Sequence, residues 1–90
     1  MLARAVDDPD WSVRREAAMQ LGFGEGSEVT SLLRRLLGDS NPDVVEAAIG
    51  SAAFVGDKSA LRELEQLARA HQNEDVREKA GRGVRELRDL

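Results

Sequence analysis

Two groups of closely spaced carboxylates are the first candidates for chemistry in this chain. Asp7, Asp8 and Asp10 stand close together, and Glu74 is followed directly by Asp75. Paired carboxylates act as general acid and base only where a pocket perturbs their pKa values. Both groups stand where helices are expected to begin, and capping and the helix dipole already account for acidic residues there. The sequence therefore assigns them a structural role.

The other candidates for chemistry are equally isolated. The single histidine, His71, falls in a turn without potential ligands nearby, and the absence of cysteine excludes disulfides and thiolate zinc sites. The glycine-rich stretch 22–26 follows an expected helix rather than a strand and lacks the Lys-Ser/Thr pair of a phosphate-binding loop. We therefore expect no enzyme activity, no metal and no cofactor.

The composition limits the classes of partner. Hydrophobic residues make up 41% of the chain, charged residues 33%, and the net charge is −4. A nucleic-acid binder normally carries a basic balance, so this acidic chain is expected not to bind nucleic acid. No apolar run approaches the roughly 20 residues of a membrane span, and residues 1–6 are too short and charged for a signal peptide. The expectation is one small domain over residues 1–90, in the cytoplasm and off the membrane.

Turn-forming clusters divide the chain into helical segments. Between the breaks, apolar residues recur at helical spacing, and Ser27 is a good candidate to cap the segment that follows it. The strongest stripe consists of Val29, Leu32, Leu33, Leu36 and Leu37. The pattern predicts an all-α fold of about five to six helices.

The helical segments repeat with a period of 31 to 32 residues. The equivalent positions hold Val13, Val44 and Val76; Ala17, Ala48 and Ala80; Leu21, Ala52 and Val84; and, in the turns, Asp10, Asn41 and Asn73. Small residues where the first helices of successive repeats meet permit close approach of their backbones. The line from Val13 through Ala17 to Leu21 is therefore expected to be core.

The repeated unit resembles a HEAT repeat of the short bacterial type, similar to phycobilisome-lyase repeats. The resemblance covers essentially the whole chain, and its first copy matches the pattern at Asp8, Asp10, Val13, Arg14, Ala17, Leu21 and Gly22. It implies an α-α superhelix, a solenoid of roughly two and a half repeats. It also implies a ladder between adjacent turns, formed by aspartates and arginines: Asp8, Asp39, Arg14 and Arg77. The second copy has Val45 where the arginine belongs, and the third has His71 for the aspartate.

The resemblance further implies that the second helix of each pair lines the concave side. Arg34 and Arg35 fall on one such helix, and Arg62, Gln66 and Arg69 on the next. A groove lined by these five side chains can receive an acidic peptide or a phosphate-bearing partner through charge-assisted hydrogen bonds. The alternative is an ordinary solvated face, because three glutamates dilute the charge: Glu28, Glu63 and Glu65.

Trp11 is the sole tryptophan and has no equivalent in the other copies. It stands in a turn, outside the apolar stripe of the helix that follows. It is either a packing anchor over the preceding helix or an exposed contact residue of the kind enriched at interfaces.

Both ends of the solenoid are expected to need covering, because terminal repeats otherwise expose apolar faces. The side chains concerned are Leu2, Ala5 and Val6 at one end, and some of Val84, Leu87 and Leu90 at the other. Either the chain is a piece of a longer array or it self-associates through its ends.

The function that this pattern favours is non-enzymatic: a scaffold or interaction module that binds a protein partner. A second hypothesis, an accessory role in bilin lyase chemistry, has little support in a chain without Cys or Tyr. A third, resemblance to HEAT-like alkylpurine DNA glycosylases, conflicts with the acidic and aromatic-poor composition. The fourth is a self-assembling structural module that stacks through its ends.

Overall fold

The computed structural model describes residues 2–90, and of Leu2 the backbone alone. The elements are α1 (Leu2–Ala5), α2 (Trp11–Leu21), α3 (Ser27–Leu37), α4 (Pro42–Val55), a 3-10 turn η1 (Lys58–Ala60), α5 (Leu61–Ala70) and α6 (Glu74–Arg88). Across residues 2–90 the regular elements are all helical, which confirms the all-α prediction of five to six helices.

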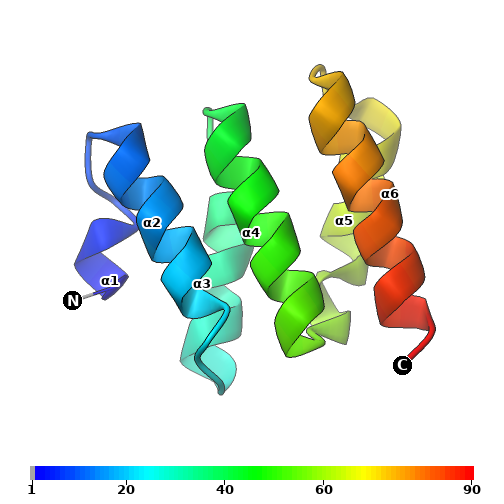
Figure 1. Cartoon of the computed structure of the whole chain (residues 1–90), viewed down its shortest axis with the longest axis horizontal. Coiled ribbons are helices and arrows are strands. Elements are labelled where there is room, and N and C mark those ends of the chain that lie inside the picture. The colour runs from blue at the N-terminus through cyan, green and yellow to red at the C-terminus, as the bar shows by residue number, and fades with distance from the viewer. Residues whose placement is uncertain (1) are drawn as a thin grey trace.

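The helices form two layers (Figure 1). Helices α2, α4 and α6 lie side by side in front, while α3 and α5 lie behind them. Each front helix packs against its neighbour, α3 packs on α4, and α5 packs on α6. The molecule measures 32 × 28 × 15 Å. This arrangement of helix pairs is a small α-α repeat stack, as the repeated pattern predicts.

The three front helices begin with side-chain caps at equivalent positions. The carboxylate of Asp10 and the amides of Asn41 and Asn73 each accept a hydrogen bond from a backbone N–H of the first turn. The expectation that Ser27 caps α3 is wrong. Gly26 is the N-cap of α3, with φ of +100°, and Ser27 is already helical.

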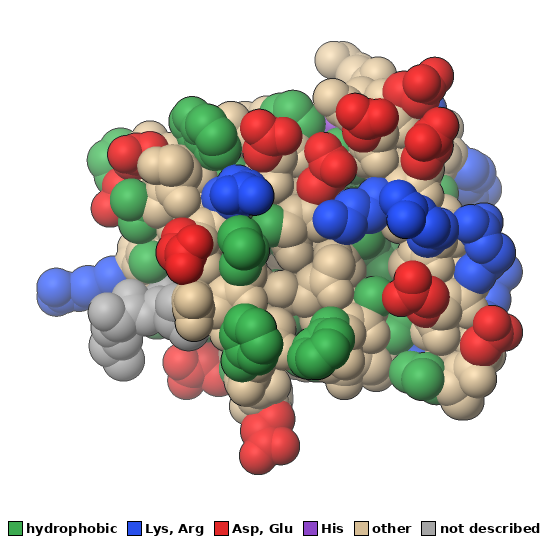
Figure 2. Space-filling view, in the orientation of Figure 1, with side chains coloured by type: hydrophobic (Ala, Val, Ile, Leu, Met, Phe, Trp, Pro, Cys, Tyr) green, Lys and Arg blue, Asp and Glu red, His purple; other side chains and the backbone are tan. Residues whose placement is uncertain are grey.

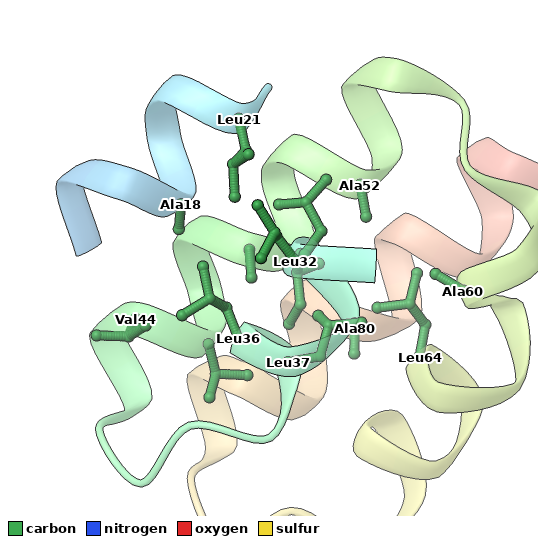
Figure 3. Close-up of a cluster of buried hydrophobic side chains, with 14 of the residues drawn as sticks. Ala18, Leu21, Leu32, Leu36, Leu37, Val44, Ala52, Ala60, Leu64 and Ala80 are labelled. Carbon is green, nitrogen blue, oxygen red and sulfur yellow. The ribbon is translucent and has the colours of Figure 1, made fainter. Parts of the chain in front are cut away.

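The core is aliphatic and centres on α4. Val44, Val45, Ala48 and Ala52 are fully buried, and Ile49 is almost so. Figure 3 shows the cluster, with Ala18 and Leu21 from α2, Leu32, Leu36 and Leu37 from α3, Ala60 from η1, Leu64 from α5, and Ala80 from α6 converging on α4. A helix that is apolar around most of its girth must be covered on several sides, and α4 is.

Small residues set the spacing between α2 and α4. The Ser51 hydroxyl of α4 donates a hydrogen bond of 2.6 Å to the Ala18 carbonyl oxygen of α2. A Cβ atom on Gly22 would lie 2.7 Å from the same hydroxyl oxygen. The two backbones are therefore as close as their side chains allow.

One predicted core residue lies at the surface. Ala17 and Leu21 are buried as expected, but Val13 is 37% exposed, whereas its equivalents Val44 and Val76 are fully buried. Helices α4 and α6 each have a preceding front helix packed against them, while the described neighbour of α2 on that side is only the short α1. The expectation for Val13 is wrong because burial at this position requires that neighbour.

The two ends of the stack differ in how they compare with the sequence-based expectation. Val6 is buried, so the expectation that it lacks a cover is wrong; at the other end Val84 and Leu87 are buried in the core. Leu90 is 70% exposed, as expected, and Ala5 is half-buried. The expectation for the side chain of Leu2 lies outside the described residues.

The packing of the core predicts the effect of shortening the buried side chain of Leu64 on α5. Leu64 is fully buried, with a methyl group 3.4 Å from the position of a Cβ on Gly83. Leu64→Ala should lower the free energy of unfolding by about 2–5 kcal/mol, because it removes transfer energy and leaves a cavity. Leu90→Ala, at an exposed leucine, should change it by less than about 0.5 kcal/mol. Urea denaturation followed by circular dichroism measures both, and equal losses would contradict the assigned packing.

Candidate protein-binding surfaces

The clustered carboxylates near the N-terminus are used to build a turn. The carboxylate of Asp10 accepts hydrogen bonds from the hydroxyl of Ser12 at 2.7 Å and from its backbone N–H at 2.9 Å. These bonds lower the pKa of Asp10 below its ordinary value. Asp8 in turn accepts the backbone N–H of Asp10 at 2.8 Å. A carboxylate with a lowered pKa is a poor proton donor near neutral pH, which fits a capping role.

An arginine bridges the first two turns of the stack. Arg14 Nε lies 2.8 Å from Asp39 Oδ2 and its Nη2 lies 3.2 Å from Oδ1, a two-point ion pair. Its Nη1 donates to the carbonyl oxygens of Asp8 and Pro9 in its own turn, at 2.7 and 3.2 Å. The carboxylate of Asp39 raises the pKa of Arg14. Arg14 therefore fastens its own turn and the next one with a single side chain.

The equivalent bridge between the second and third turns is absent, because both partners are replaced. Val45 stands in the place of Arg14, and His71 in the place of Asp39. His71 still accepts the backbone N–H of Asn73 through Nδ1, at 3.0 Å, as Asp39 accepts that of Asn41. The turn is thus retained while the ion pair is not.

The predicted basic groove is only partly assembled. Arg34 and Gln66 line one depression of about 360 Å³ between α3 and α5, together with Leu37 and Leu67. Arg34 Nε lies 2.6 Å from Glu63 Oε2, so its charge already has a partner.

The remaining predicted residues lie elsewhere. Arg35 forms an ion pair with Asp7 of the first turn, in a different depression from that of Arg34. Arg62 and Arg69 are exposed on α5 and do not line the depression of Arg34. Trp11 is the first residue of α2 and is 43% exposed. Helix α2 stands at the opposite end of the front layer from α6 (Figure 1).

An exposed apolar surface lies on the opposite, front layer of the stack. Phe23 is 79% exposed, Phe54 76% and Met19 41%. The two phenyl rings meet edge to face, with centroids 6.2 Å apart and planes at 65°. Figure 2 shows hydrophobic side chains gathered on this face, over the C-terminal ends of α2 and α4. We call Met19, Phe23 and Phe54 the aromatic patch.

The aromatic patch borders a depression of about 470 Å³ between α2 and α4. Gly22, Gly50 and Ser51 lie in its lining, where small residues leave room. Lys79 of α6 reaches over Gly50, with Nζ 3.6 Å from the position of a Cβ there. The surface thus combines two exposed rings, an accessible hollow and a nearby cation.

Sequence reasoning misses the aromatic patch, although a signal is present. Phe23 and Phe54 are 31 residues apart, which is the repeat period, so they occupy equivalent positions after the core stripes of α2 and α4. Taken one at a time, Phe23 reads as part of a loop and Phe54 as the end of an apolar helix. An aromatic residue that recurs at the repeat period outside the core stripe is a surface feature that the repeat alignment can identify.

The stacked helix pairs and the Arg14–Asp39 bridge define the class of this protein as an α-helical repeat stack. The family model of HEAT repeats matches residues 1–85, and the chain therefore belongs to the HEAT-repeat family. That match does not identify the phycobilisome-lyase type in particular. A comparison with curated proteins found no match.

Two further features of residues 2–90 bear on function. They contain no group of three or more His, Cys, Asp or Glu side chains placed to hold a metal ion. None of their helices combines the length and hydrophobicity that crossing a bilayer requires.

The bridge between turns can be tested by a double-mutant cycle. Arg14→Gln and Asp39→Asn should each lower the midpoint of thermal unfolding by several degrees, because each removes one half of a shielded ion pair. The double variant should lose clearly less than the sum of the two, since its second substitution has no ion pair left to break. Circular dichroism measures the midpoints, and strictly additive losses would show that the pair is not coupled. Arg34→Gln, at a half-exposed ion pair, is the matched control and should have a smaller effect.

Proposed function

We propose that this chain is a non-enzymatic protein-binding module whose main contact surface is the aromatic patch. HEAT repeats generally mediate protein–protein interaction. The observation that carries the proposal is the exposure of Phe23 and Phe54 in a chain whose large aliphatic side chains are mostly buried. Fold stability does not require rings that are more than three-quarters exposed, so their presence is better explained by an intermolecular contact.

The geometry of the patch suits a hot spot. Aromatic side chains supply large contact area with few rotatable bonds, and binding energy concentrates on a few such residues. The edge-to-face contact limits the motion of the two rings before binding. The hollow beside them can receive a side chain of the partner, which the rings would then shield from water.

The charged residues around the hollow are of both signs, so they would help to orient a partner and would not repel partners of either net charge. Arg15 and Lys79 line it together with Asp43 and Glu46, two cations and two anions. Mixed charges at the rim contribute to the choice and orientation of a partner more than to its affinity. An apolar anchor flanked by polar residues is therefore the kind of protein segment that fits.

The depression between α3 and α5 supports a second candidate surface. Leu37 and Leu67 line it, while Arg34 and Gln66 stand at the same site. An acidic segment of a partner could compete with Glu63 for the Arg34 guanidinium. The exposed Arg62 and Arg69 would add to the attraction at longer range.

The aromatic patch is tested by partner capture with purified variants. Phe23→Ser/Phe54→Ser should leave the unfolding midpoint nearly unchanged, because both rings are exposed, and should weaken partner binding on the order of 30-fold or more. Isothermal titration with the captured partner measures the affinity. Leu90→Ser, which removes another exposed apolar side chain, is the control and should bind normally. Unchanged affinity of the double Phe variant would refute the role of the patch.

The same partner tests the second surface independently. The double variant Arg34→Glu/Arg35→Glu reverses two charges on α3, in the rear layer, and leaves the aromatic patch intact. If the α3–α5 depression binds the partner, this variant should weaken binding and remove part of its salt dependence, because charge-assisted contacts are lost. Unchanged partner capture by this variant would rule out the depression and leave the patch.

A further inference from the structure

The two sides of the front layer carry complementary halves of one junction. Inside the molecule, α2 packs on α4 and α4 packs on α6. No further front helix among residues 2–90 covers the outer side of α2 or the outer side of α6 (Figure 1). What each outer side would accept can be inferred from the internal junctions, because the three front helices are repeats of one another.

The outer side of α6 carries an arginine that reproduces half of the bonds of Arg14. Arg77 is the equivalent of Arg14, and its Nη1 donates to the carbonyl oxygens of His71 and Gln72, at 2.6 and 3.1 Å, just as Arg14 binds its own turn. In Arg14, Nε and Nη2 then bind the carboxylate of Asp39 in the next turn. Within residues 2–90, Arg77 has no carboxylate partner for these two groups. Its guanidinium is therefore bound to its own turn through Nη1 alone, and Nε and Nη2 have no carboxylate partner among the described residues.

The outer side of α2 carries the acceptor that this arginine lacks. Asp8 is the equivalent of Asp39, and both accept the backbone N–H two residues further on, at 2.8 and 2.9 Å. Asp39 also receives Arg14, whereas among the described residues Asp8 forms no ion pair. The two ends therefore present the donor and the acceptor of one missing bridge.

The comparison of equivalent positions in the repeats also predicts a second charge pair. At the junction of α4 and α6, Lys79 lies over Gly50. The repeat places Glu16 of α2 in the position of Lys79, and Arg82 of α6 in the position of Gly50. Stacking α6 on α2 in the internal geometry would set Glu16 over Arg82, which are both exposed and of opposite charge. Figure 2 shows Lys and Arg side chains gathered on the α6 side of the molecule.

The apolar parts of the two faces correspond, and their side-chain sizes differ from those of the internal junction at two positions. Val13 is exposed where Val44 and Val76 are covered by a preceding front helix. Gln20 is larger than its equivalent Ser51, and the residue it would face is Gly81, smaller than the Ala18 that faces Ser51. Arg85 stands where α2 has Gly22, and a Cβ at Gly22 would lie 2.7 Å from the Ser51 hydroxyl oxygen, so α6 and α2 of two copies can meet only at a wider spacing than α2 and α4 have.

We infer that a second copy of this chain stacks on the first from head to tail, with α6 of one copy packed against α2 of the next. Arg77 closes the bridge to Asp8 of the neighbouring copy, Glu16 pairs with Arg82, and Val13 is covered. This contact is heterologous: each joined pair keeps an unsatisfied α2 side and an unsatisfied α6 side. Further copies therefore add in the same way and continue the solenoid beyond one chain.

The contact depends on exposed charges, so it should weaken as salt rises. Sedimentation velocity over a concentration series at low salt should give an average mass that rises from 9.8 kDa towards twice that value and beyond. Added salt should return the mass to that of the monomer. A monomer at every concentration in low salt would overturn the inference and leave another protein, or further repeats in the same polypeptide, to cover α2.

Charge reversal identifies the bridge. Arg77→Glu and Asp8→Arg should each remove association, because each places like charges at the junction. An equimolar mixture of the two variants should associate again. In the mixture the carboxylate introduced in one variant meets the guanidinium introduced in the other, and at the alternating junction the native Arg77 meets the native Asp8. Restoration in the mixture excludes misfolding as the cause of the single losses, and failure to restore association would overturn the proposed pairing.

The control variant is Arg15→Glu, which reverses a charge on α2 but within the depression between α2 and α4. It should associate like the wild type. Phe23→Ser/Phe54→Ser should also associate normally, since the aromatic patch lies outside both outer faces. The two proposals can therefore fail separately.

Discussion

The distance between α2 and α4 constrains everything else in this fold. The Ser51 hydroxyl donates a hydrogen bond to the carbonyl oxygen of Ala18. Residue 22 must be glycine, because any side chain there would clash with the same hydroxyl. At this spacing no Cβ fits at Gly22, and the buried leucines of the rear layer, such as Leu33 and Leu36, fill the space behind the front helices. Each helix pair can therefore pack on the next one in the same way, which is why one short sequence pattern can build the whole chain.

The same constraint determines what remains at the surface. Once the core stripe of a front helix is committed to its neighbours, a side chain just beyond the end of that stripe has no interior position available. Phe23 and Phe54 occupy this place in successive repeats, and stacking brings their rings together. The aromatic patch is therefore a product of the repeat: one aromatic position, used twice, gives a pair of rings that neither repeat could form alone.

Most of the fold follows from local patterns in the sequence. The caps Asp10, Asn41 and Asn73 and the apolar stripes act within one helix, so spacing alone is enough to predict them. The exposure of Val13 and Val6 differs from the sequence-based expectation because burial depends on which helix lies alongside, and that is a property of the stack. Only a tertiary structure specifies the neighbour.

The candidate sites are harder to predict for a related physical reason. Arg34 and Arg35 lie on α3 and Gln66 on α5, but the partners of the two arginines come from other repeats. Glu63 is 29 residues from Arg34, and Asp7 is 28 residues from Arg35. A count of charges along one helix cannot reveal that these cations are already paired. The position of Phe54, by contrast, is available from the repeat period once Phe23 is compared with it.

The replacement of Arg14 and Asp39 by Val45 and His71 at the second junction makes the stack mechanically uneven. The α2–α4 junction is held by apolar packing together with a shielded ion pair, whereas the α4–α6 junction is held by apolar packing, in which Val45 is fully buried. Thermal fluctuations that open the stack should then divide it at two places with different sensitivities. Salt screens the ion pair of the first junction, whereas cooling weakens the apolar packing that is all that holds the second, because hydrophobic association fades as temperature falls. A chain of similar repeats thus contains two dissimilar junctions, and salt concentration or temperature can determine which of them opens first.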